Sequence, residues 1–122
     1  MKLIIAGSRS ITDYKHVKEA VIASGLWKKY GKSLEIVCGM ASGVDWLGKE
    51  FAEKNGLILH KFPADWKTFG KSAGYIRNKQ MAEFADCLIA VYDGKSKGTK
   101  HMIDIANEKG LGVFVYLVKE NK

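Results

Sequence analysis

The sequence contains one proline, two cysteines and no long apolar segment. Because glycine is frequent (13 residues) while proline is almost absent, the composition suits a fold with many turns between strands and helices. No apolar run reaches the roughly 18 residues of a membrane span, so we expect no membrane contact. Cys38 and Cys87 lack the spacing of metal ligands, and we expect two buried thiols in a cytoplasmic protein.

The amino-terminal residues 1–7 (MKLIIAG) superficially resemble a signal peptide, with a lysine before an apolar stretch. The stretch is shorter than the roughly 7–15 apolar residues of a secretory signal, so we interpret it as a first buried strand. Apolar residues make up 47% of the chain, enough for a real core. We expect one domain over residues 1–122.

Basic residues exceed acidic ones, giving a net charge of +7. This charge permits three interpretations: an anionic small ligand, nucleic acid, or a merely basic surface. The lysines are scattered, without an arginine-rich run or interleaved aromatic motif. The sequence therefore permits nucleic-acid binding but does not favour it.

Short apolar runs alternate with segments of helical periodicity along the whole chain. The expected strands lie at residues 3–6, 34–38, 57–62, 87–92 and 113–118. The expected helices lie at residues 12–30, 43–55, 72–85 and 99–109. This alternation predicts an α/β fold, a Rossmann-like doubly wound parallel sheet of about five strands flanked by helices. Ligands of such sheets bind outside the carboxyl ends of the strands, where the strand order reverses.

Glycine-containing loops follow three of the expected strands, at residues 7–10 (GSRS), 39–45 (GMASGVD) and 93–99 (DGKSKGT). Glycine lets the backbone approach a ligand, and two of these loops open helices whose free N–H groups attract anions. Each loop alone is explained by turn geometry, but three at one sheet edge favour a phosphate site. The candidate ligand-binding residues in these loops are Gly7, Ser8, Arg9, Gly39, Ser42, Gly43, Asp45, Asp93, Gly94, Lys97, Gly98 and Thr99.

Four further candidates lie outside these loops. Arg77 and Asn78 stand early in the third helix, where a solvated arginine is the plain alternative. Asp65 and Trp66 follow the third strand; Trp66 either stacks on a base or packs over the sheet edge. The three histidines share no motif, so we expect no metal ligand and no cofactor.

Five ordered motifs together resemble the SLOG superfamily, at residues 4–9, 39–45, 62–66, 74–81 and 93–99. The superfamily joins the DNA-processing protein of natural transformation to the Lonely Guy phosphoribohydrolases. The resemblance covers nearly the whole chain and is strongest to the small stand-alone branch of YspA/YAcAr type, common in bacteria and phages. It implies a Rossmann-like sheet and a nucleotide-derived ligand.

The phosphoribohydrolases of this superfamily cleave the N-glycosidic bond of a nucleoside monophosphate with an arginine in R-K-x-x-M and a glutamate in P-G-G-x-G-T-x-x-E. Arg77 matches the arginine, but Met102 occupies the glutamate position and handles no proton. Asp104 lies about 200° further round the helix and should point elsewhere. Asp45 or Asp93 is left as an alternative catalytic carboxylate beside Arg77.

Three functions therefore stay open. The first is binding, for sensing or sequestering, of a nucleotide or ADP-ribose-like ligand, including a phage or bacterial defence signal. The second is nucleotide or nucleoside N-glycosidase activity, and the third is single-stranded nucleic-acid binding. We also expect a homo-oligomer, a dimer or higher, because large aromatics are available to cover a shared face; they are Trp27, Tyr30, Trp46 and Phe69.

Overall fold

The fold is built on one parallel five-stranded sheet, described by a computed structural model over residues 1–41 and 43–119. The strand order is β3-β2-β1-β4-β5. The strands are β1 (Lys2–Gly7), β2 (Glu35–Cys38), β3 (Ile58–Lys61), β4 (Cys87–Tyr92) and β5 (Gly112–Leu117). The predicted doubly wound parallel sheet is confirmed. β1 is central, and the strand order reverses between β1 and β4, because the chain runs outward from β1 to β3 and then crosses to β4 on the other side of β1.

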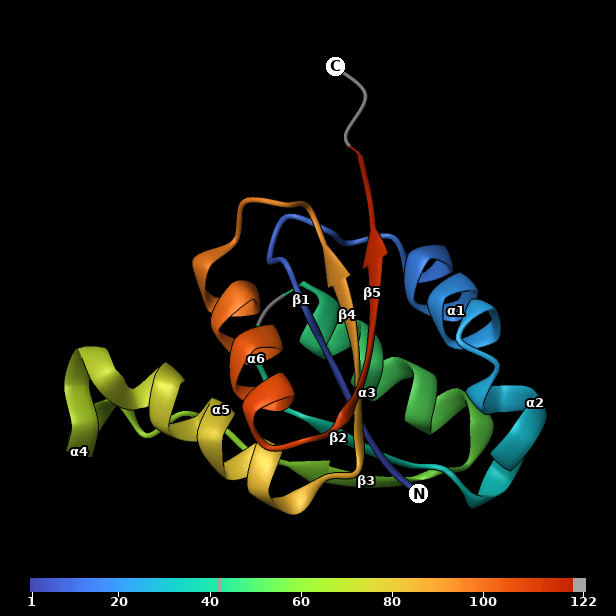
Figure 1. Cartoon of the computed structure of the whole chain (residues 1–122), viewed down its shortest axis with the longest axis horizontal. Coiled ribbons are helices and arrows are strands. Elements are labelled where there is room, and N and C mark those ends of the chain that lie inside the picture. Colours follow the sequence, from blue (N-terminus) through green and yellow to red (C-terminus); the bar gives the residue numbers. More distant parts are fainter. Residues whose placement is uncertain (42, 120–122) are drawn as a thin grey trace.

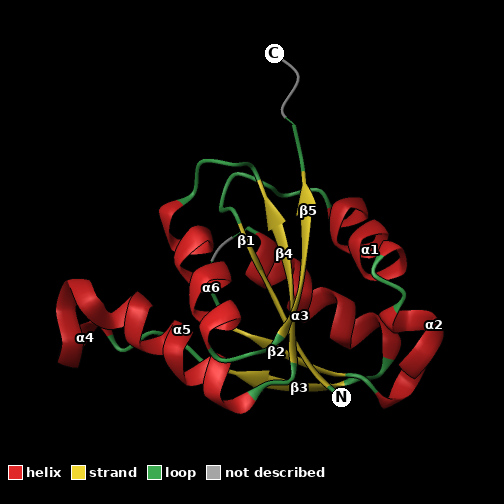
Figure 2. Cartoon of the chain, viewed as in Figure 1, coloured by secondary structure: helices red, strands yellow, loops and turns green. Residues whose placement is uncertain are grey.

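Helices cover both faces of the sheet (Figures 1 and 2). One face carries α1 (Tyr14–Ala23), α2 (Leu26–Tyr30) and α3 (Val44–Asn55). The other carries α5 (Ala73–Phe84) and α6 (Lys97–Glu108). The short α4 (Trp66–Phe69) projects from the body beside α5 (Figure 1). Two single 3₁₀ turns, η1 (Gly31–Ser33) and η2 (Gly70–Ser72), complete the described elements.

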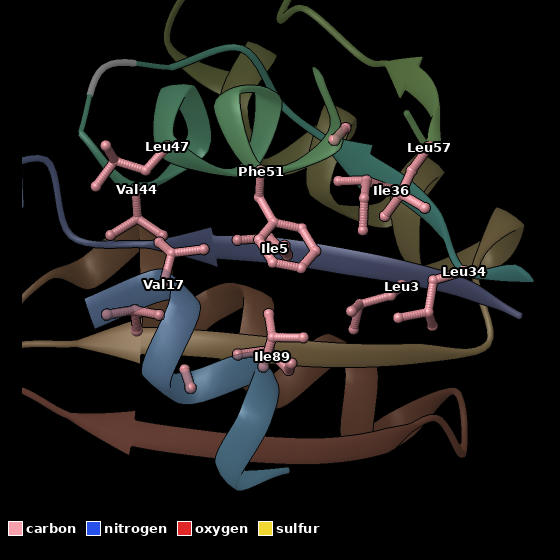
Figure 3. Close-up of a cluster of buried hydrophobic side chains, with 14 of the residues drawn as sticks. Leu3, Ile5, Val17, Leu34, Ile36, Val44, Leu47, Phe51, Leu57 and Ile89 are labelled. Carbon is pink, nitrogen blue, oxygen red and sulfur yellow. The ribbon is translucent and has the colours of Figure 1, made fainter. Parts of the chain in front are cut away.

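Two apolar cores lie on the two faces of the sheet. The larger joins β1, β2 and β4 to α1 and α3, and Figure 3 shows Ile5, Phe51 and Ile89 meeting at its centre. The smaller joins the opposite faces of the same strands to α5 and α6 through Met81 and Met102. Because β1 is buried on both faces, its run of apolar residues carries no polar alternation. Cys38 and Cys87 are buried free thiols, as expected.

Some predicted boundaries were wrong. The helix expected over residues 12–30 is broken, because the Ser24 hydroxyl donates to the Val21 carbonyl and Gly25 adopts φ 80°. Trp66, which the sequence places only after the third strand, begins α4, whose first turn is capped by the Asp65 carboxylate accepting from the Thr68 N–H. α6 begins at Lys97, two residues before the prediction, because Ser96 caps it. A local hydroxyl or carboxylate set each of these boundaries.

We expect Phe51→Ala to destabilise the protein by about 3–5 kcal/mol, because a large core side chain is replaced by a cavity. Phe51 is 4% exposed and meets the Trp27 ring edge-on at 5.8 Å. Ile22→Ala on α1 is the matched control, since Ile22 is 57% exposed and its loss should change stability by less than about 0.5 kcal/mol. Urea unfolding measures the free energy of unfolding of both variants, and equal losses of stability would contradict the core described above.

Candidate functional site

A cavity of about 470 Å³ opens beyond the carboxyl ends of β1 and β4, between the first turns of α3 and α6 and the side of α5. This is the edge at which the strand order reverses, where the ligands of doubly wound sheets bind. The cavity is lined by Ala6, Gly7, Arg9, Ser10, Ala41, Asp45, Trp66, Lys71, Gly74, Tyr75, Arg77, Asn78, Met81, Asp93, Ser96, Gly98, Thr99 and Met102.

The structure brings nine of the sequence-predicted residues to this cavity: Gly7, Arg9, Asp45, Trp66, Arg77, Asn78, Asp93, Gly98 and Thr99. Six others lie in the same loops without lining it: Ser8, Gly39, Gly43, Asp65, Gly94 and Lys97. Ser42, also predicted, lies outside the described residues. The glycine loops thus meet at one edge of the sheet, as the sequence predicted.

The loops after β1 and β4 are joined by hydrogen bonds. The buried Ser8 hydroxyl accepts from the Asp93 N–H at 3.1 Å. The Asp93 carboxylate in turn accepts from the N–H groups of Lys95 and Ser96, at 2.8 and 2.9 Å, and these bonds hold the pKa of Asp93 below its ordinary value. Ser8 and Asp93 therefore shape the loops.

Asp45, on the first turn of α3, holds the loop after β2. Its carboxylate accepts from the Ala41 N–H at 3.2 Å. The residue is only 5% exposed, and this burial raises the pKa of Asp45 to about 6, against the opposing effect of the Arg77 guanidinium. The site thus holds a carboxyl group that exchanges a proton near neutral pH.

Arg77 reaches from α5 to the loop after β2. Its Nη1 donates to the Gly39 carbonyl and its Nε donates to the Asn78 Oδ1 at 3.0 Å. Burial lowers the pKa of Arg77, and the charge of Asp45 opposes that shift. A Cβ on Gly39 would approach three atoms of this guanidinium to within 3.0 Å, so glycine is what leaves room for the arginine. The geometry favours Arg77 as a fixed cation and not the solvated side chain of the alternative interpretation.

Asn78 ties Arg77 to α6. It is 6% exposed, and its Nδ2 lies 3.4 Å from the Gly98 carbonyl and 3.2 Å from the His101 Nδ1. At the start of α6, the Ser96 hydroxyl accepts from the N–H and from the hydroxyl of Thr99. The amino end of α6 thus faces the cavity beside Arg77, with its dipole positive toward that space.

The sequence interpretation missed several lining residues, chiefly Ser10, Lys71, Tyr75 and Ser96. Ser10 and Ser96 lie inside the glycine-containing loops after β1 and β4, so their place in those loops could have identified them. Tyr75 lies in the motif at residues 74–81, but nothing in the sequence singled out its side chain, and Lys71 lies in no motif. The turn through α4 and η2 brings both residues to the cavity.

Met102 stands where the hydrolases that the sequence resembles have a glutamate, and the structure shows it 1% exposed at the cavity wall. Asp104 points away, as predicted, and its carboxylate pairs with Lys100 at 2.9 Å. Within residues 1–41 and 43–119 no cluster of three or more histidine, cysteine or acidic side chains is arranged to hold a metal ion. In that same part of the chain, no helix has the length and apolar character needed to span a membrane.

Asp45 should make the stability of the protein fall as the pH rises from about 4 to about 6.5. Its folded pKa lies above the unfolded value of about 3.9, so across this window the folded chain holds a proton that the unfolded chain releases. Relative to Asp45→Asn, the free energy of unfolding should drop by about 2 kcal/mol over the window. Urea unfolding at stepped pH measures both proteins, and parallel curves would contradict the raised pKa.

Solved structures share the fold. DNA processing protein A (DprA) from Streptococcus pneumoniae superposes with a TM-score of 0.73 over 93% of this chain, at 20% identity. DprA from Helicobacter pylori, described for its single-stranded DNA binding mode, superposes with a TM-score of 0.69 over the whole chain, at 21% identity. The chain spans about half of the first protein (49%) and 67% of the second.

Two sequence comparisons show the family. The Gene 61 protein of Mycobacterium phage D29 is 33% identical over an alignment of 120 residues, which covers 92% of this chain and 93% of that protein. The model of the YspA, cpYpsA-related SLOG family matches residues 1–69, more than half of the chain. These residues include β1, β2 and the loops that carry Arg9 and Asp45, and the chain belongs to the YspA, cpYpsA-related SLOG family.

Proposed function

We propose that this chain binds a small phosphate-bearing ligand, a nucleotide or ADP-ribose-like molecule, in the cavity beyond β1 and β4. The observation that carries the proposal is the Arg77 guanidinium, which two hydrogen bonds hold beside the amino end of α6. A planar guanidinium and the N–H groups of a helix start are the groups that proteins use for phosphate. The cavity volume, about 470 Å³, is that of a small-molecule site.

The charges of the lining support an anion. Arg9, Lys71 and Arg77 outnumber the two carboxylates, Asp45 and Asp93. Asp93 is already engaged by two backbone N–H groups, and Asp45 takes up a proton near pH 6. An incoming phosphate therefore meets a net positive wall, and its charge would raise the pKa of Asp45 further.

Binding without turnover, as in a sensor or sequestering protein, agrees with the apolar side chain at position 102. Met102 presents no group that could transfer a proton to or from a glycosidic bond. Asp45 and Asp93 each accept backbone N–H groups that hold the loops together. Both carboxylates thus have a structural role in the loops that surround the cavity.

Binding should appear as ligand-dependent stabilisation in thermal unfolding, followed by calorimetry, with AMP, ADP-ribose, ribose 5-phosphate and inorganic phosphate as probes. A ligand at a hundred times its Kd adds about 2.7 kcal/mol to the free energy of unfolding. Arg9→Gln and Arg77→Lys should each weaken binding about tenfold or more, because each removes charge-assisted hydrogen bonds. Arg9 is exposed, so its variant tests the site without disturbing the core.

Lys54→Gln is the matched control. Lys54 lies in the last turn of α3, far along the helix from the cavity, and its ammonium pairs with Glu50. This variant removes one positive charge from the protein and should leave binding unchanged. Absence of stabilisation by every phosphate compound at millimolar concentration, or equal losses in the control and the two arginine variants, would refute the proposal.

N-glycosidase activity is a second candidate, favoured by one observation: a buried carboxyl group with a pKa of about 6, influenced by Arg77, lines the cavity. That pKa suits a general acid or base near neutral pH. Incubation with nucleoside monophosphates and chromatography for the free base tests it. If Asp45 carries the reaction, Asp45→Asn should abolish release of the base while phosphate binding persists. Release of the base that survives this substitution would show that another residue carries the reaction.

Single-stranded DNA binding is a third candidate, favoured by the fold shared with the Helicobacter pylori protein and by the net charge of +7. Binding to an oligonucleotide should weaken steeply with salt, because cations are released from the phosphates. An affinity that does not change with salt would exclude this electrostatic mode.

A further inference from the structure

Two half-exposed aromatic side chains stand in the wall of the proposed phosphate site. Trp66 is 53% exposed and Tyr75 is 50% exposed, and both line the cavity. Other exposed aromatics, Trp46 and Phe69, lie outside it. Scattered exposed apolar residues are ordinary, but two aromatic side chains that line one cavity offer a stacking surface to a ligand.

Trp66 is held close to Arg77. Its backbone begins α4 under the Asp65 cap, and a Cβ on Gly74 would lie 3.6 Å from the indole ring and 3.9 Å from the Arg77 Nη2. The indole and the guanidinium thus both lie next to the same glycine. A molecule whose anionic group reaches Arg77 therefore has an aromatic surface directly beside it.

Tyr75 is supported from α6. Its ring centroid lies 4.4 Å from that of His101, at an interplanar angle of 51°, and the His101 Nδ1 contacts Asn78. The contact orders the tyrosine while half of its surface remains exposed. A side chain that is already ordered loses little conformational entropy when a ligand stacks on it.

The surrounding charges select the kind of ring. Lys71 lines the cavity together with the two aromatics, and Arg9 and Arg77 line its remaining wall. A cationic ligand, which aromatic faces otherwise attract, would be repelled by these three groups. A neutral aromatic ring joined to an anion satisfies both the aromatic and the cationic parts of the wall.

We infer that the ligand is a nucleoside phosphate whose base stacks on Trp66 and Tyr75, so that these residues select a base-bearing phosphate over a bare sugar phosphate. The inference rests on the phosphate-binding function proposed above. A sugar phosphate without a base would reach Arg77 but leave both rings in water. Stacking of a base on an aromatic side chain is sequence-tolerant, so the wall demands a base without fixing which one.

The test uses the fluorescence of Trp66 itself. The chain has three tryptophans, and Trp27→Phe with Trp46→Phe leaves Trp66 as the sole indole. Titration with AMP should quench its emission, and ribose 5-phosphate should bind without quenching. AMP should bind about tenfold more tightly than ribose 5-phosphate, the size expected from stacking one base.

Trp66→Ala and Tyr75→Leu, in the otherwise natural chain, should each weaken AMP binding about tenfold and leave ribose 5-phosphate binding unchanged. Phe69→Ala is the matched control, because Phe69 lies on α4 with Trp66, is 45% exposed and does not line the cavity. It should alter neither affinity. Calorimetry gives the affinities, and circular dichroism confirms that each variant is folded.

The outcomes separate this inference from the phosphate site. Equal affinities for AMP and ribose 5-phosphate, unchanged by Trp66→Ala, would overturn the aromatic wall and leave the phosphate site standing. Quenching by AMP that is insensitive to Arg77→Lys would support the wall and overturn the phosphate site. Absence of binding by both compounds would overturn both.

Discussion

The cavity depends on the reversal of strand order beside the central strand β1. Because β1 pairs with β2 on one side and β4 on the other, the loops that follow these strands diverge at one edge of the sheet. Gly7 is essential to this junction, since a Cβ there would overlap the carbonyl oxygen of Val91 on β4. Gly7 therefore permits the close pairing of β1 with β4 directly beside the cavity.

Most polar groups around the cavity build its walls. Ser8 accepts from a backbone N–H of the loop after β4, Asp45 and Asp93 accept from backbone N–H groups of their own loops, and Asn78 joins Arg77 to α6. Buried charged groups need such partners, and Asp45 and Arg77 show the effect of burial: it raises the pKa of the carboxyl and lowers the pKa of the guanidinium. The side chains left facing the space are mainly cationic and aromatic.

This distribution of polar and cationic side chains supports the ligand-binding function proposed above. The hydrolases that the sequence resembles place a glutamate where this chain has the buried Met102, and the two nearby aspartates are engaged with the backbone. Among the described residues of the cavity, Asp45 is the carboxyl group whose pKa burial raises to about 6. A shared fold hosts different activities, so function has to be argued from these side chains.

The sequence by itself determined the five-stranded parallel sheet, since buried strands and amphipathic helices leave a periodic pattern in the chain. It also determined that glycine loops with Arg9, Asp45 and Thr99 meet at one edge, because parallel strands all end there. Only the tertiary structure decided that Lys71 and Tyr75 reach the cavity, and that Arg77 bonds the Gly39 carbonyl 38 residues away. Contacts between such distant residues depend on how α4 and α5 pack beside the sheet, and no local pattern records that packing.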